Sequence, residues 1–177
     1  MEEKRTFMRI PTRLGGRLRL LADGDELQIF RETPFFGASS GMCAHEAHEA
    51  GMSEGLYAFL CSLDAKLDML LSMQHRDELE TDFPVAIQVL EISGAGVRFT
   101  TEESLAIEQP VEAVLMLSRF PLRMAGAVGR IIRQDLREDG LTEYALDFTR
   151  IRERDLESIV QFVFQSQRDE LRGKKWD

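Results

Sequence analysis

The sequence predicts a mainly β protein with added helices (α+β): a small six-stranded β-barrel, a C-terminal helix and one long inserted amphipathic helix. Three observations support this fold class. Short apolar or alternating segments separated by turn residues fill the region 84–148, a helical apolar pattern closes the chain, and leucines recur at heptad spacing within 56–70. Several short strands followed by one helix favour a barrel that the helix covers.

The composition permits one packed domain with an extra element and argues against several protein classes. The 177 residues are 44% hydrophobic and carry a formal charge of −9. This charge argues against general nucleic-acid binding, which depends on a broad basic surface. Apolar runs fall short of the roughly 18 residues that a membrane span needs, so we expect no membrane insertion. With two cysteines and no leader-like opening, the expected location is cytoplasmic.

The region before the long helix combines strand and loop patterns. Residues 16–21 alternate polar and apolar side chains, which is typical of a strand with one buried face. A second short strand is predicted at 26–30, after the turn-forming residues 23–25. Residues 33–51 contain proline, glycines and serines and are predicted to form a linker or irregular insert.

The segment from Ser53 to about Gln74 has the pattern of an amphipathic helix. Its leucines alternate four and three residues apart, as in a coiled-coil seam, and are Leu56, Leu60, Leu63, Leu67 and Leu70. Further apolar residues widen this face, which favours more than two helices or packing on the parent domain. We expect a homo-oligomer through this helix. The alternative is a helix buried within one chain, because three heptads are near the lower limit of the coiled-coil signal.

The chain from residue 84 onward predicts most of the barrel. The pair Asp139-Gly140 supplies the positive backbone angles of a tight hairpin, which would join strands at 123–134 and 141–148. The other strands of this region are predicted at 84–90, 96–100 and 111–117. A closing helix is predicted from Glu153 to about Leu171, with an apolar face made of Leu156, Ile159, Val160 and Val163.

The first twenty residues concentrate positive charge in an otherwise acidic chain. Six basic residues and two glutamates give this segment a charge of +4, which leaves −13 for the remainder. Most of the basic residues are arginines, whose guanidinium forks suit bidentate binding of phosphate or stacking on a nucleobase. We expect a small, locally held anion as the ligand. The alternative is that the arginines pair with the chain's own carboxylates.

A glycine-rich turn between two predicted strands is the second candidate for ligand contact. Residues 90–99 read Leu-Glu-Ile-Ser-Gly-Ala-Gly-Val-Arg-Phe. The glycines allow close approach and expose backbone N–H groups, while Ser93 offers a short donor and acceptor and Glu91 a carboxylate. Taken alone, such a segment is most often only a turn.

Together, the two segments resemble the motif pair of the PilZ family, Arg-x-x-x-Arg and Asp/Asn-x-Ser-x-x-Gly. The first motif is complete from Arg5 to Arg9 and is followed by Ile-Pro, as is common in the family. The second motif reads Glu-x-Ser-x-x-Gly from Glu91 to Gly96. The resemblance implies a small β-barrel that binds the bacterial second messenger cyclic di-GMP and relays its level to motility, biofilm or secretion machinery.

The resemblance also implies a domain organisation. It covers residues 4–21 and 83–171 and leaves the segment between them unmatched. The predicted domains are therefore a discontinuous barrel domain, 1–21 with 83–177, and an insertion at 22–82 that contains the heptad helix.

By this resemblance, Arg5 and Arg9 would clasp cyclic di-GMP through phosphate, guanine edge or stacking, Ser93 would add a polar contact and Gly96 would keep the turn open. Arginine is the usual bidentate partner of phosphate and of guanine O6 and N7. Two further cations are predicted contacts, namely Arg98 just after the turn and Lys4 beside Arg5.

Glu91 departs from the family pattern, which has Asp or Asn at this position. A carboxylate can accept from the guanine N1 and N2 donors, and the extra methylene moves that acceptor by about a bond length. It also adds rotamer entropy, of order 0.5 kcal/mol, to the cost of immobilisation. Loss of one charged hydrogen bond, about 1.5 to 3 kcal/mol, would weaken binding roughly ten- to a hundredfold.

No signature of catalysis or of a metal site rises above background. The candidate metal ligands are Cys43, His45, His48 and His75. To bind one metal ion they would have to converge from a predicted loop and a helix end. Cys61 falls on the helix, and no histidine in the β region could activate Ser93. Asp147 and the carboxylates of the last helix are interpreted as solvated charges or ion pairs.

The expectation is therefore a non-enzymatic protein without metal or cofactor. The favoured hypothesis is a cyclic di-GMP receptor whose basic arm folds over the barrel when the ligand binds. The alternative is a ligand-independent oligomerisation or protein-interaction module, in which the heptad helix carries the function.

Overall fold

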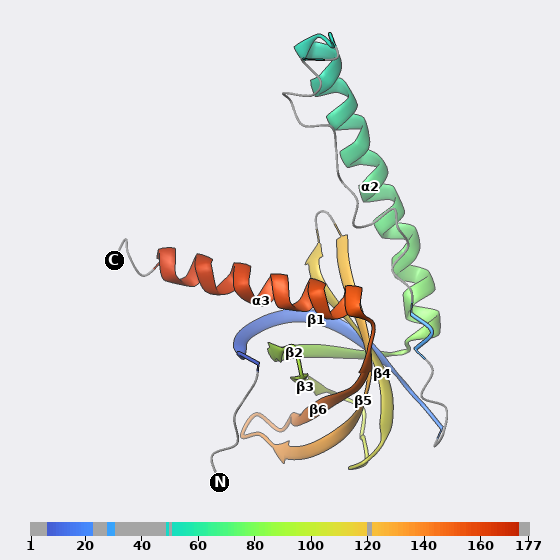
Figure 1. Ribbon diagram of the computed structural model, residues 1–177. Helices are drawn as coiled ribbons and strands as arrows, with labels where there is room; N and C mark the ends of the chain where they lie inside the picture. Colours follow the sequence, from blue (N-terminus) through green and yellow to red (C-terminus); the bar gives the residue numbers. More distant parts are fainter. Residues whose placement is uncertain (1–6, 23–27, 31–48, 50, 120–121, 174–177) are drawn as a thin grey trace.

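The structure is a computed structural model that describes residues 7–22, 28–30, 49, 51–119 and 122–173. Within these residues, six antiparallel strands close into a barrel in the order β1-β2-β3-β6-β5-β4 (Figure 1). The strands are β1 (Ile10–Leu20), β2 (Val85–Ser93), β3 (Gly96–Thr101), β4 (Pro110–Arg119), β5 (Leu122–Leu136) and β6 (Thr142–Ile151). The helices are α2 (Glu54–Asp82) and α3 (Glu153–Gly173). The predicted fold class is confirmed.

The barrel is filled by apolar side chains from all six strands, and no strand has a free edge. Phe99 and Tyr144 stack in the interior with ring centroids 5.7 Å apart. The predicted hairpin joins β5 to β6, and Gly140 there has a φ of +82°, which is the left-handed conformation that favours glycine. The strands that this hairpin joins are longer than predicted: β5 runs two residues further into the hairpin, to Leu136, and β6 runs three residues further at its other end, to Ile151.

Strand β4 is buried on both faces, which explains its nearly continuous apolar sequence. Its inward side chains join the core, while Val114 on the outer face is covered by Phe30 and by Phe83 at the base of α2. The strand predicted at 26–30 is wrong for residues 28–30, because the N–H groups of Ile29 and Phe30 donate to the carboxylate of Glu112 instead of joining a strand ladder. Residues 26 and 27 lie outside the described residues.

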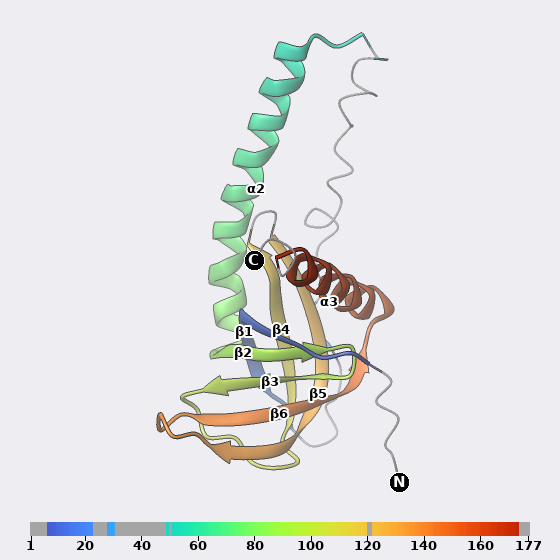
Figure 2. The same cartoon turned by 90° about the vertical axis from the view of Figure 1, so that its left-hand side faces the viewer.

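Helix α3 lies against β5, β2 and β1 and buries Ile159 and Val163 in the core, as its apolar pattern predicted (Figure 2). The carboxylates of this helix were interpreted as solvated charges or ion pairs, and the first of these is wrong for Asp155, which is only 5% exposed. Its carboxylate accepts hydrogen bonds from the backbone N–H of Gly126 at 3.2 Å and from Gln28 Nε2 at 3.1 Å. These bonds fix the first turn of α3 to β5 and to the segment 28–30.

Helix α2 begins where predicted and runs further than predicted. The hydroxyl of Ser53 caps it by accepting the N–H of Leu56 at 3.3 Å, and the helix continues past Gln74 to Asp82. Leu79 and Phe83 at its C-terminal end are buried against the outer face of β4, while the rest of the helix projects away from the barrel (Figures 1 and 2).

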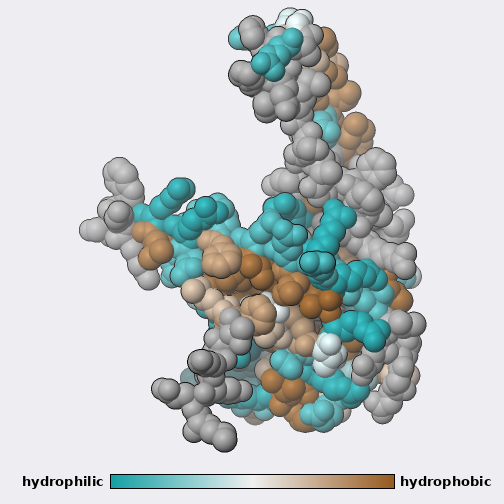
Figure 3. Space-filling model, in the orientation of Figure 1, coloured by the Kyte–Doolittle hydropathy of each residue, from teal (hydrophilic) through white to brown (hydrophobic). Residues whose placement is uncertain are grey.

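The heptad leucines lie on the projecting part of α2. All five are exposed, between 41% and 63%, so the described part of the chain does not bury this face. Figure 3 shows apolar side chains along the projecting part of the helix. The alternative of a helix buried within one chain is therefore wrong for this face.

Neither described helix has an apolar stretch long enough to cross a membrane. No group of three or more His, Cys, Asp or Glu side chains in the described ranges is placed to hold a metal ion. Of the candidate metal ligands, Cys43, His45 and His48 lie outside the described residues.

Candidate functional site

The glycine-rich turn forms a tight corner between β2 and β3. The hydroxyl of Ser93 donates to the carbonyl of Gly96 at 3.1 Å and accepts the N–H of Ala95 at 3.3 Å, so this side chain stabilises the turn from within. A Cβ on Gly96 would lie 2.2 Å from the carbonyl oxygen of Leu146 on β6. Glycine is therefore required at this position by the close approach of β6, in addition to any role in keeping the turn open for a ligand.

The N-terminal segment passes beside this turn and brings the two sequence motifs together. The ring of Phe7 lies over Gly94, where a Cβ would come within 2.5 Å of it. Pro11 pairs with Glu91 in the ladder between β1 and β2, so Arg9 is carried to the same corner. Arg9 Nη1 lies 3.7 Å from Glu91 Oε1. Lys4 and Arg5 lie outside the described residues.

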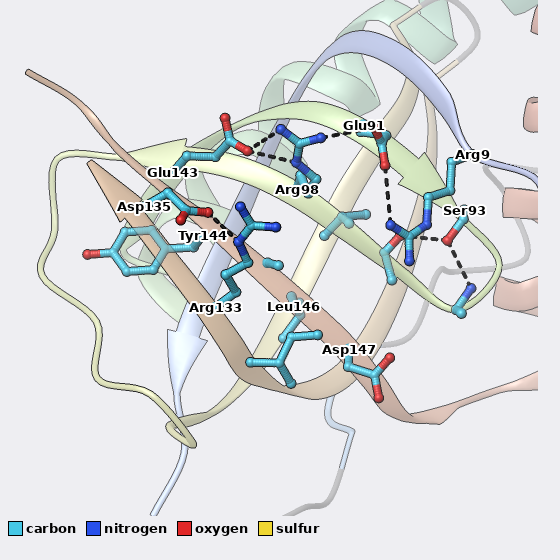
Figure 4. Close-up of a pocket in the computed structure, with 15 residues that line it drawn as sticks. Arg9, Glu91, Ser93, Arg98, Arg133, Asp135, Glu143, Tyr144, Leu146 and Asp147 are labelled. Carbon is cyan, nitrogen blue, oxygen red and sulfur yellow. Dashed lines mark hydrogen bonds and ion pairs between the residues drawn. The ribbon is translucent and has the colours of Figure 1, made fainter. Parts of the chain in front are cut away.

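Arg98 is held between two carboxylates (Figure 4). It donates to Glu91 Oε2 at 3.2 Å and, through Nε, to Glu143 Oε1 at 2.7 Å. These interactions raise the pKa of Arg98 above its ordinary value, with the hydrogen bond to Glu143 as the largest cause. Glu143 in turn lies 3.5 Å from Arg137. A chain of alternating charges therefore crosses the barrel surface from Arg9 to Arg137.

One cavity of about 160 Å³, on the outside of β2, β3, β6 and β5, is lined by four members of this chain of charges: Arg9, Glu91, Arg98 and Glu143. The five described residues among the predicted ligand contacts all border it: Arg9, Glu91, Ser93, Gly96 and Arg98. The remaining charged lining residues are Arg133, Asp135, Glu143 and Asp147. Three arginines and four carboxylates thus face the cavity, whose described lining carries no net positive charge.

The contribution of β5 and β6 to this cavity was not predicted. Arg133 Nε lies 2.5 Å from Asp135 Oδ2, and Glu143, Tyr144 and Asp147 complete the wall. By alternation, the expected hairpin could have placed Arg133, Asp135, Glu143 and Asp147 on its outer face, whereas Tyr144 lies on the inner face and stacks with Phe99. The pairing of β6 with β3, which brings the outer face to the turn, has no local signal in the sequence.

Two other arginines of the basic N-terminal segment, Arg17 and Arg19, contact a second location. Arg17 donates to the carbonyl of Phe83 at 2.7 Å and lies 3.2 Å from Glu80, which fixes the base of α2. Arg19 Nε lies 2.7 Å from the buried carboxylate of Glu112. For these two residues the alternative of internal pairing is correct. Arg9 also lies within ion-pair distance of a carboxylate of the chain, that of Glu91, but at the candidate site.

The family model of the PilZ domain matches residues 66–165, which is more than half of the chain. The chain belongs to the PilZ domain family. This match includes the turn motif from Glu91 to Gly96 and does not extend to the arginine motif. A search of curated proteins finds no match to the sequence.

Solved PilZ-domain structures share the fold at low sequence identity. One from Xanthomonas campestris, described as a tetrameric PilZ domain self-assembled via a helical bundle, gives a TM-score of 0.54 at 13% identity over 94% of this chain and 91% of that chain. The Bacillus subtilis inhibitor of motility (MotI/DgrA) gives a TM-score of 0.53 at 9% identity. That likeness covers 94% of this chain, which spans only 53% of the length of the Bacillus protein.

Proposed function

We propose that this chain is a non-enzymatic cytoplasmic receptor that binds cyclic di-GMP where the N-terminal arm meets the turn from Glu91 to Gly96. The bound state would be relayed to motility, biofilm or secretion machinery. The observation that supports this function best is the position of Arg9 beside Glu91, since the two motifs are far apart in sequence and meet at one cavity. Membership of the PilZ family agrees with this assignment.

The chemistry of the site suits an anionic dinucleotide. The Arg9 side chain is 54% exposed, so a phosphate or the O6 and N7 edge of guanine can reach its guanidinium group from solvent. We assign Arg5, and Lys4 beside it, to the same ligand as further cations of the arm. The cavity is smaller than the roughly 300 Å³ at which pockets for drug-sized ligands begin. The ligand would therefore rest across its mouth, and the arm would fold over the ligand.

Isothermal titration of the purified chain with cyclic di-GMP tests this function. Saturable binding that Arg9→Ala removes and that GMP does not reproduce is the expected result. Arg123→Ala is the matched control, because Arg123 is an exposed arginine on β5 that does not line the cavity. Absence of binding at high ligand concentration, or equal binding by Arg9→Ala, would contradict the proposed site.

The exposed leucines of α2 favour a second role, which is self-association. We propose that 22–82 is an insertion into the barrel domain and that its helix assembles copies of the chain through the five leucines. A monomer that exposed five leucines along one projecting helix face would leave a contiguous apolar surface in water. The Xanthomonas PilZ domain described as assembled by a helical bundle provides a precedent within the same fold.

A further inference from the structure

Glu91 lies at the centre of the candidate site. It contacts Arg9 and Arg98, the two arginines that are both predicted to bind the ligand and included in the described residues. Its two carboxylate oxygens face different partners: Oε1 lies 3.7 Å from Arg9 Nη1 and Oε2 lies 3.2 Å from Arg98 Nη1. Figure 4 shows the Glu91 carboxylate between the two guanidinium groups. The N–H groups that would bind a phosphate are thus directed at a carboxylate of the protein itself.

The length of the side chain makes this double contact possible. Glu91 extends from β2 toward Arg9 of the arm on one side and toward Arg98 of β3 on the other. An aspartate at this position would withdraw the carboxylate by about 1.5 Å, one carbon–carbon bond. The contact of 3.7 Å with Arg9 would then exceed the range of a direct ion pair. A glutamate therefore neutralises Arg9 where an aspartate or asparagine would leave it available.

The charges around the cavity support the same conclusion. Arg98 is also bound by Glu143 and Arg133 by Asp135, so each described arginine that lines the cavity has a carboxylate partner. Glu91 is the carboxylate shared by the two arginines nearest the turn. An anionic ligand must displace or share these contacts, and it can reach both arginines that Glu91 contacts, because the side chains of Arg9 and Arg98 are 54% and 45% exposed.

We propose that Glu91 is an internal counterion that competes with the ligand's phosphates for Arg9 and Arg98, and so lowers the affinity of the site. The inference rests on the proposed cyclic di-GMP function and concerns its regulation. It differs from the expectation that Glu91 accepts hydrogen bonds from guanine. A competing carboxylate weakens binding, so its removal strengthens binding, whereas removal of a ligand acceptor has the opposite effect.

Titration of cyclic di-GMP into the full chain and its Glu91→Gln variant tests the competition. Glutamine keeps the size of the side chain and removes the charge, so we expect binding to tighten roughly tenfold at low salt. The gain should shrink toward 1 M salt, because the screening length falls from about 10 Å at 0.1 M to about 3 Å. Glu91→Asp should give a smaller gain. Glu102→Gln, an exposed residue beyond the opposite end of β3, removes the same charge and should leave the affinity unchanged.

The outcomes separate this inference from the proposed function. One outcome is that the wild type binds cyclic di-GMP, Arg9→Ala does not, and Glu91→Gln binds with the same affinity as the wild type or a lower one. The receptor function is then supported and the counterion role is overturned. If the wild type fails to bind while Glu91→Gln binds, the counterion role is supported and the receptor function of the wild type is overturned. If neither chain binds, although both show the same cooperative thermal unfolding, the receptor function itself is overturned and the counterion role with it.

Discussion

The carboxylate of Glu112 on β4, which is fully buried, accepts a hydrogen bond from the backbone N–H of Phe30 at 2.8 Å. It also accepts from Ile29 N–H at 3.2 Å and from Arg19 Nε at 2.7 Å. One side chain therefore holds β1 and the segment 28–30 against the outer face of β4. Phe30 in turn packs against Phe83 at the base of α2, with ring centroids 6.3 Å apart.

Loss of the Glu112 carboxylate should destabilise the fold strongly. Glu112→Ala leaves the guanidinium of Arg19 and two backbone N–H groups without this acceptor, and breaking a buried charge pair in this way typically costs about 3 to 5 kcal/mol. Urea unfolding followed by circular dichroism measures the loss. The exposed Glu102→Ala should change the free energy of unfolding by less than about 0.5 kcal/mol. Similar small effects for both variants would contradict the role assigned to Glu112.

Asp155 should make stability depend on pH. Its pKa is raised above 3.8, mainly because burial disfavours the charged carboxylate, although hydrogen bonds from Gly126 and Gln28 and the charges of Arg152 and Arg154 oppose the shift. The folded state therefore holds this proton more tightly than the unfolded state, whose pKa is about 3.9. The contribution of Asp155 to the free energy of unfolding is complete below about pH 3.9 and is lost as pH rises through the folded pKa.

The measurement is a comparison of urea unfolding for the wild type and Asp155→Asn between pH 4 and 7. The asparagine does not titrate, so the stability of the wild type minus that of the variant should fall as pH rises, by at most about 1.4 kcal/mol per pH unit. Lost hydrogen bonds in the variant add an offset that is independent of pH. A difference that stays flat or rises with pH would contradict the prediction.

Two neighbouring glycines should respond differently to alanine. A Cβ on Gly96 would meet the backbone of β6 at 2.2 Å, so Gly96→Ala must separate β3 from β6 and should cost about 1 to 3 kcal/mol or more. A Cβ on Gly94 would meet only the ring of Phe7, which is exposed. Gly94→Ala should therefore leave the stability of the barrel nearly unchanged and displace the arm. Thermal unfolding of the two variants compares them, and equal losses would contradict this distinction.

Much of the barrel could be predicted from the sequence because its signals are local. The Asp139-Gly140 pair and the apolar face of the last helix each predict an element within a few residues of its observed position, whereas the alternation at 16–21 predicts only the later part of β1. The end of α2 could not be predicted in this way. Residues after Gln74 are mostly polar, and the helix continues to Asp82 where Leu79 and Phe83 pack on β4, a contact between distant parts of the chain.

The buried polar groups were missed for the same reason. Glu112 and Asp155 resemble surface carboxylates in sequence, and their partners at Phe30 and Gln28 lie 82 and 127 positions away. At the candidate site, the sequence motifs indicate Arg9 and Glu91 and predict that they meet. The hydrogen-bonded ion pair between Arg98 and Glu143 depends on the register between β3 and β6, which no local sequence pattern determines.

The leucines of α2 lead to the last prediction, which concerns assembly. Leu63 lies in the middle of the exposed heptad face, and an aspartate there would place a charge in any interface between helices. We expect the wild type to sediment as an oligomer and Leu63→Asp as a monomer at the same concentration. Ala65→Asp adds the same charge two residues later, on the other side of the helix, and should leave the oligomer intact.

Cyclic di-GMP binding should survive in the monomeric Leu63→Asp variant, because α2 projects away from the barrel and the cavity at Arg9 has no lining residue from this helix. Sedimentation velocity and titration of the same samples therefore test assembly and ligand binding independently. A monomeric wild type, or an oligomer that persists in Leu63→Asp, would contradict assembly through the leucines. Loss of binding together with loss of assembly would instead show that the ligand site needs a second copy of the chain.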